Sequence, residues 1–242
     1  MRAYARVVAE ADGHGGTRLV RLRGEPPLLP RRTGTGTGPA TVHLVGGAAG
    51  PLGGDELRLD IEVGPGAALC VRTVAASVAL PARSGARSRS VVTATVAAGG
   101  SLRWLPEQLV AAAGCNHASV ATVELAAGAS LLWRDELVCG RHAEEPGDAM
   151  VRLSVRYAGR PLLHQVLSVG PGAAGWAGPA VLGGAKATGT VLRVEPDAPP
   201  PTSRVLAPTA VHLVLTPEAS LVTATAPDAH TLRGCLSLDA SA

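Results

Sequence analysis

The chain has 242 residues, 46% of them hydrophobic, and a formal net charge of +3 at pH 7. This weak charge, with only two Tyr, three Trp and no Phe, argues against a nucleic-acid-binding surface, which needs clustered basic residues and aromatic side chains for base stacking. No apolar run approaches about 18 residues without interruption by charge, glycine or proline, so we expect no membrane span.

Most of the chain has the pattern of short strands separated by turns. The clearest strand, residues 56–63, alternates strictly between apolar side chains (Leu57, Leu59, Ile61, Val63) and charged ones (Glu56, Arg58, Asp60, Glu62). This period of two indicates a strand with one buried face. Further strands are expected at residues 3–10, 17–23, 41–45, 67–75, 91–96, 101–105, 119–125, 131–139, 150–157, 162–169, 211–215 and 221–225.

The remaining segments are mostly turns and loops. Residues 25–32 contain three prolines and cannot form a central strand, while residues 33–38 are a flexible loop. The glycine-rich segment 170–189 has no clear assignment, and residues 195–201 are expected to be a linker or exposed loop. One helix is predicted at residues 228–238, where Asp228 is a candidate N-cap.

A strand–glycine turn–strand unit recurs along the chain. The pattern V-x-x-G-A-x-L at residues 63–69 returns in related form at residues 96–102 and 125–131. Its glycines, Gly66, Gly99 and Gly128, are 33 and then 29 positions apart (99 minus 66, 128 minus 99). A repeat of this length favours stacked β coils, as in a β-helix. The alternative is that similar hairpins recur within an ordinary β-sandwich. We therefore predict an all-β fold with a short helix or two, in one domain spanning residues 1–242.

The usual enzyme signatures are absent. The sequence has neither the G-x-S-x-G nucleophile elbow nor the H-E-x-x-H zinc motif. Two pairs, Cys115 with His117 and Cys139 with His142, place a thiol near an imidazole. Such ligands suit nickel, copper or zinc, although pairs of this kind also arise by chance. Whether either pair binds a metal is left open by the sequence.

Two carboxylates have distinctive surroundings. Asp55 directly follows Gly53 and Gly54, where its side chain could cap the turn by accepting backbone hydrogen bonds or could serve as a metal ligand. Asp135 lies in a largely apolar strand, so its carboxylate must be paired, solvated or directed into a wet interior.

The four cysteines, Cys70, Cys115, Cys139 and Cys235, form no CxxC pair and do not have the spacing of a disulfide framework. The first 13 residues lack the apolar core of a signal peptide and contain Glu10 and Asp12. Together these features predict a cytoplasmic protein.

Three segments carry a family resemblance. GPLGGDELRLDIEVGPGAAL at residues 50–69, SLRWLPEQLV at residues 101–110 and LLWRDELVCGR at residues 131–141 resemble, in order and spacing, the urease accessory protein family UreD, also called UreH. The most specific pieces are Gly53-Gly54-Asp55 and Trp104-Leu105-Pro106. The resemblance is good over residues 15–170 and looser elsewhere.

The resemblance implies a two-layered β-helix-like fold and a function without catalysis. Members of this family are urease maturation scaffolds that bridge UreF and the GTPase UreG to apo-urease, and nickel is thought to pass through their interior. By this resemblance the chain would bind no cofactor tightly and would carry nickel in transit. Composition already argues against nucleic acid and membrane as partners, and a homodimer of heterocomplexes is one option. Residues 195–242 would be a C-terminal partner-binding segment.

Nickel in transit needs weak, exchangeable ligands. Asp55 and Asp135 are candidates because they lie in the matched segments. His164 is a third candidate, next to a position where the family often has a carboxylate. Two other functions stay open. The chain could be a diverged β-rich interaction module, or an acid–base enzyme that uses Asp55 or His164.

The chain departs from the family pattern at several positions. Ser77-Val78-Ala79-Leu80 replaces a T-K-x-Y segment, so Val78 and Leu80 stand where Lys and Tyr are usual. Glu107 replaces the Gln that follows W-L-P, and Gln165 stands where a carboxylate is frequent. These changes bear on partner affinity and metal passage more than on the fold.

Overall fold

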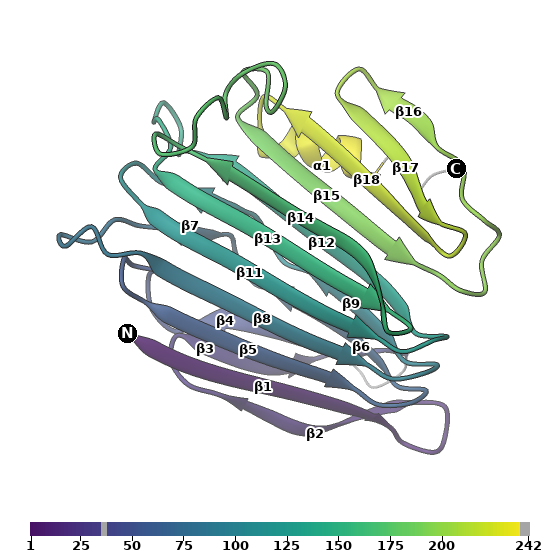
Figure 1. Cartoon of the computed structure of the whole chain (residues 1–242). Coiled ribbons are helices and arrows are strands. Elements are labelled where there is room, and N and C mark those ends of the chain that lie inside the picture. Colours follow the sequence, from purple (N-terminus) through teal and green to yellow (C-terminus); the bar gives the residue numbers. More distant parts are fainter. Residues whose placement is uncertain (35–37, 238–242) are drawn as a thin grey trace.

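The computed structural model describes residues 1–34 and 38–237, and it consists of two β-sheets that face each other (Figure 1). The first sheet has the strand order β14-β13-β11-β8-β5-β1-β2. Its strands, in chain order, are β1 (Arg2–Ala11), β2 (Thr17–Gly24), β5 (Glu56–Val63), β8 (Ser88–Val96), β11 (Asn116–Leu125), β13 (Asp148–Tyr157) and β14 (Arg160–Val169).

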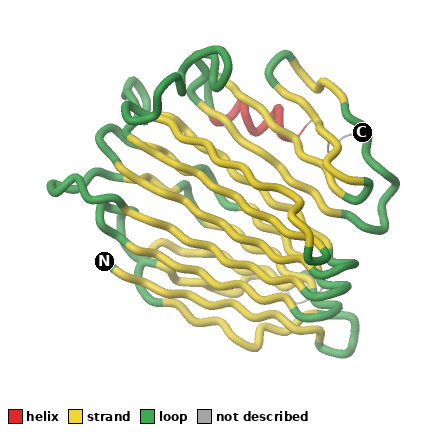
Figure 2. Tube along the Cα trace, in the orientation of Figure 1, coloured by secondary structure: helices red, strands yellow, loops and turns green. Residues whose placement is uncertain are grey.

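The second sheet has the order β16-β17-β18-β15-β12-β9-β6-β4-β3. Two short strands lie off this path: β10 pairs with β12, and β7 pairs with β10. Its strands are β3 (Leu28–Thr33), β4 (Ala40–Gly46), β6 (Ala68–Thr73), β7 (Ser77–Ala79), β9 (Ser101–Leu105), β10 (Leu109–Ala111), β12 (Ser130–Cys139), β15 (Ala187–Val194), β16 (Arg204–Ala207), β17 (Ala210–Thr216) and β18 (Ala219–Ala226). The one helix among the described residues, α1 (Ala229–Ser237), packs on β15 and β18 (Figure 2).

The glycine repeat forms the stacked coils that the sequence predicts. Each glycine turn carries the chain from the first sheet to the second, from β5 to β6, from β8 to β9 and from β11 to β12, and neighbouring coils pair in parallel. Gly66, Gly99 and Gly128 have φ angles of 66°, 68° and 75°, which glycine adopts without steric cost. The Gly99 amide donates to the Gly128 carbonyl oxygen at 3.1 Å, so the turns lie directly on one another. The fold is therefore a β-solenoid.

Two glycine substitutions should change stability in opposite directions. Gly99→Ala should lower the free energy of unfolding by about 1–2 kcal/mol, because alanine is strained at a positive φ angle. Gly234→Ala should raise it by up to about 1 kcal/mol, because Gly234 lies within α1 and a Cβ there would meet nothing within 4 Å. Urea titration of both variants measures these changes. Equal effects would contradict the assigned turn.

The core lies between the sheets and is built mainly from small aliphatic side chains. As predicted, the apolar face of residues 56–63 is buried: Leu57, Leu59, Ile61 and Val63. Trp104 is buried too and stacks on Trp133, with ring centroids 5.1 Å apart. Both tryptophans lie five positions after the glycine of their coil, so the repeat places one above the other.

Other predicted elements agree with the structure to within a few residues, with informative exceptions. The proline-containing segment forms β3 at the edge of the second sheet, where a strand tolerates proline. The sequence missed β15, which is central and buried on both faces. Asp228 caps α1, because its Oδ1 accepts a hydrogen bond from the Thr231 amide at 2.7 Å. Residues 35–37 of the predicted loop and residue 238 of the predicted helix lie outside the described residues.

Candidate functional site

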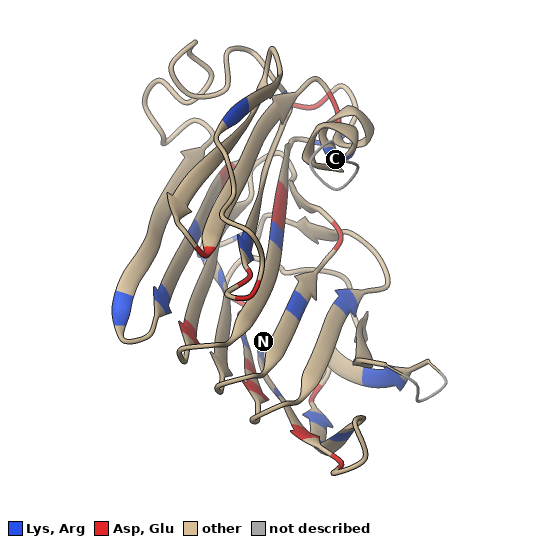
Figure 3. Ribbon diagram, turned by 90° about the vertical axis from the view of Figure 1, so that its right-hand side faces the viewer, with Lys and Arg blue, Asp and Glu red and all other residues tan. Residues whose placement is uncertain are grey.

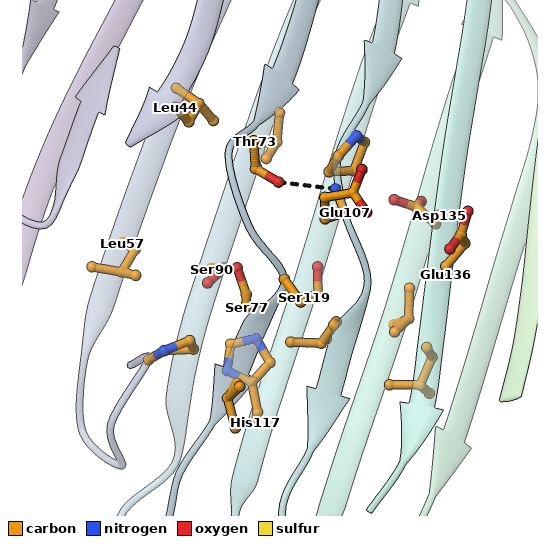
Figure 4. A pocket seen from close by; sticks show the side chains of 18 of the residues that line it. Leu44, Leu57, Thr73, Ser77, Ser90, Glu107, His117, Ser119, Asp135 and Glu136 are labelled. Carbon is orange, nitrogen blue, oxygen red and sulfur yellow. Dashed lines mark hydrogen bonds between the residues drawn. The ribbon is translucent and has the colours of Figure 1, made fainter. Parts of the chain in front are cut away.

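A cavity of about 710 Å³ lies between the two sheets, near the break in the second one. Inward-facing side chains of the first sheet line one side, and the segments that join β6 to β7 and β9 to β10 line the other (Figure 4). Most of its wall is apolar. The polar groups that reach it include Ser77, Ser90, Glu107, His117, Ser119, Asp135, Glu136 and Gln165.

The cavity exists because the second sheet is interrupted. Strand β12 pairs with β9 at residues 130–133 and with β10 at residues 137–139. Between these, residues 106–108 form no strand, since Pro106 has no N–H to donate to a ladder. The Arg134 side chain holds this segment by donating to the Pro106 carbonyl oxygen at 2.9 Å. Asp135 and Glu136 therefore lie on β12 beside a gap.

Asp135 is the one predicted site residue that lines the cavity. Its Oδ2 accepts a hydrogen bond from Trp133 Nε1 at 2.7 Å. Burial raises the pKa of this carboxyl from 3.8 to about 6, and the hydrogen bonds from Trp133 and Trp104 only partly oppose that rise. Part of its surface borders the cavity, but protein surrounds the carboxylate on the other sides. Near neutral pH the Asp135 carboxylate is thus charged. Among the described residues, no cationic side chain lies within salt-bridge distance of it.

The other two predicted site residues lie elsewhere. Asp55 is buried, and its two oxygens accept hydrogen bonds from the N-terminal ammonium at 2.7 Å and from the Leu52 amide at 2.9 Å. His164 is exposed on the outer face of the edge strand β14, where its Nδ1 lies 2.9 Å from Ser154 Oγ. Its neighbour Gln165 faces the cavity instead. The structure does not bring the three residues together.

His117 also lines the cavity. The sequence analysis considered it only as the partner of Cys115 in a possible metal-binding pair. It is 1% exposed, and its Nδ1 lies 2.9 Å from Ser88 Oγ. Burial and the nearby Arg87 lower the pKa of His117 to about 4, so the imidazole is neutral at neutral pH. Asp55, Ser88 and His117 each lie 11 positions before the glycine of their coil. The repeat therefore contained the signal for this row of buried polar residues.

The cysteines are all free. Burial raises the pKa of both Cys115 and Cys139 to about 11, so these thiols stay protonated at neutral pH and are poor ligands. Across residues 1–34 and 38–237, no three His, Cys, Asp or Glu side chains are grouped so that they could hold a metal ion. The Cys115/His117 and Cys139/His142 hypotheses gain no structural support from the described residues.

A partly buried ion-pair cluster lies between α1 and the break in the second sheet. Arg233 of α1 donates two hydrogen bonds to Glu136, at 3.0 and 2.8 Å, and one to Glu107 at 2.8 Å. Arg134 pairs with Glu136 from its own strand at 3.0 Å. The Glu136 side chain is only 1% exposed. Glu107, which replaces the Gln usual in the family, therefore has an ion-pair partner in Arg233.

Elsewhere the charged residues are spread over many strands and loops, with Lys and Arg interspersed among Asp and Glu (Figure 3). No helix among the described residues is both long and apolar enough to cross a membrane.

These features define a β-solenoid with an interior cavity that carries a half-buried carboxylate without an ion-pair partner and a buried neutral imidazole. The profile of the UreD urease accessory protein family matches residues 1–238, and the chain belongs to that family. It is 47% identical over 239 residues to the urease accessory protein UreD of Streptomyces avermitilis, covering 98% of this chain and 95% of the relative. It is 48% identical to urease accessory protein UreD 3 of Streptomyces griseus, covering 98% and 94%. The family supports a role in urease maturation, and these names point to a non-catalytic one.

Proposed function

We propose that this protein is a non-catalytic scaffold that helps deliver nickel to apo-urease, and that the ion passes through the cavity between the sheets. The main support for this proposal is the position of the Asp135 carboxylate. Its carboxylate reaches an otherwise mostly apolar cavity, and burial without a cationic partner is unfavourable for it. A buried group kept in a costly state is a candidate for a functional role. One carboxylate can bind a divalent cation weakly, which lets the ion leave again.

The partners in this proposal are UreF, the GTPase UreG and the urease apoprotein, as the family resemblance implies. The segment from residue 195 onward supplies the outer strands of the second sheet. Its exposed apolar side chains, among them Val205 at 77% and Leu213 at 38%, support a partner-binding role. Four free cysteines are consistent with work in the reducing cytoplasm.

The test is co-expression of urease subunits and accessory proteins with variants of this chain. Asp135→Ala should leave the accessory complex intact but lower the nickel content and activity of urease roughly tenfold, comparable to the loss when the environment of a metal ligand is disturbed. Nickel is measured by mass spectrometry on purified urease, and the complex by co-purification.

Two variants complete this experiment. His164→Ala should leave nickel loading unchanged if passage is interior, because His164 lies on the outer face. Asp55→Ala should lower the yield of complex if Asp55 acts by binding the N-terminus, and should lower nickel loading at normal yield if it is a transit ligand. Wild-type nickel loading with Asp135→Ala would rule out the proposed passage.

A further inference from the structure

The cavity holds a second potential metal ligand, at a distance from Asp135. His117 begins the inward-facing row of β11, and Ser119 follows it on the same face. Figure 4 shows His117 apart from Asp135 and Glu136, with the side chain of Ser119 between them in that view. The imidazole is 1% exposed, so the cavity is its route to any ligand.

Ser88 makes two contacts that bear on which ring nitrogen of His117 carries the proton. Ser88 Oγ lies 3.3 Å from the Asn116 carbonyl oxygen and 2.9 Å from His117 Nδ1. The single hydroxyl hydrogen can serve only one of these two contacts. With that hydrogen in the bond to the Asn116 carbonyl oxygen, which can only accept, Nδ1 carries a hydrogen and donates it to Ser88. In the neutral ring this leaves Nε2 with an unprotonated lone pair.

This arrangement is the one that metal-binding histidines have. A ligating imidazole usually donates from its other ring nitrogen to a fixed acceptor, which sets the tautomer and the ring orientation. The described residues give His117 no carboxylate partner for Nε2. Nearby hydroxyl groups could bind water that completes the coordination of an ion.

We propose that His117 Nε2 is a second, weak ligand for a borderline divalent cation such as Ni²⁺ inside the cavity, with Ser88 as its positioning residue. This inference rests on the proposed nickel passage and adds a second station to it. Imidazole suits nickel, and nearby Arg87 weakens the binding of any cation. A weak station is what passage requires, since a tight one would retain the ion.

The test uses the full-length chain with ¹⁵N-labelled histidine and tryptophan. Without metal, NMR should show His117 as the Nδ1–H tautomer. Ni²⁺, which is paramagnetic, should then broaden the His117 signals and the Trp133 indole signal, since Trp133 donates to Asp135. Broadening of the indole alone would overturn the His117 proposal and leave the Asp135 passage standing. If neither signal broadens, both the His117 ligand and the Asp135 passage are overturned. An Nε2–H tautomer of His117 would overturn the His117 proposal alone.

A matched pair of variants gives a second readout. His117→Ala and His164→Ala remove histidines whose Nδ1 lies at the same 2.9 Å from a serine hydroxyl, one inside the cavity and one on the surface. His117→Ala should weaken Ni²⁺ binding by the chain several-fold in calorimetry, and His164→Ala should not. Ser88→Ala should weaken it too, through loss of the fixed tautomer. Equal Ni²⁺ affinity in wild type and a folded His117→Ala variant would overturn the proposal.

Discussion

Replacing Arg233 with alanine should lower the free energy of unfolding by about 3 kcal/mol, the lower end of the cost of breaking a buried ion pair. Arg233 makes two hydrogen bonds to Glu136, whose side chain is 1% exposed. Without Arg233 this buried carboxylate keeps only Arg134 as a partner. The loss should also release Glu107 and loosen α1 from the break in the second sheet. Chemical denaturation at neutral pH measures the change.

The control is Arg18→Ala, which removes an ion pair of the same 2.8 Å length between exposed side chains. Solvent screens such a pair, so its loss should cost only about 0–1 kcal/mol. Adding Glu136→Gln to Arg233→Ala removes the carboxylate charge but also deprives Arg134 of it, so the double variant measures the contribution of the remaining Arg134–Glu136 pair. If Arg233→Ala destabilises no more than Arg18→Ala does, the cluster does not anchor the helix.

The coils could be predicted because their signals are local. Residues 56–63 form a strand with one buried and one wet face, so their alternation is visible in the sequence. Gly66, Gly99 and Gly128 occupy a backbone conformation that favours glycine, so the turn is marked by residue type. By contrast β15 is buried on both faces and begins Ala187-Thr188-Gly189, which shows neither alternation nor a strong strand preference.

The site was less accessible to sequence reasoning, because it depends on which residues of different coils meet. Asp135 could be singled out as a carboxylate in an apolar strand, but its hydrogen bond to Trp133 required the structure. His164 and Gln165 alternate across β14, and only the register of that strand shows that Gln165 is the inward one. The contact between Asp55 and the N-terminus joins positions 54 residues apart, for which the sequence holds no signal.

Replacing Asp135 with asparagine should stabilise the protein at pH 7 and leave it nearly unchanged at pH 4. The pKa of Asp135 is 3.8 in the unfolded chain and about 6 in the folded one. Folding therefore favours the protonated form, and its stabilising contribution, complete below pH 3.8, is lost as the pH rises to about 6. That difference corresponds to about 3 kcal/mol, and the partial exposure of Asp135 reduces it to about 2–3. Asparagine can still accept the Trp133 hydrogen bond through its side-chain oxygen.

The pH profile of the variant provides the decisive comparison, because His117 has the opposite dependence. Its pKa falls from 6.5 on folding to about 4, so its contribution to stability is lost as the pH drops through that range. In the wild type, the opposite changes that Asp135 and His117 make to the free energy of unfolding largely cancel between pH 4 and 6. Asp135→Asn should expose the His117 term as a loss of stability on acidification, whereas Asp197→Asn, on an exposed loop, should keep the wild-type profile. A wild-type profile in Asp135→Asn would show that this carboxylate costs the fold nothing, and would remove the argument that it is retained for nickel passage.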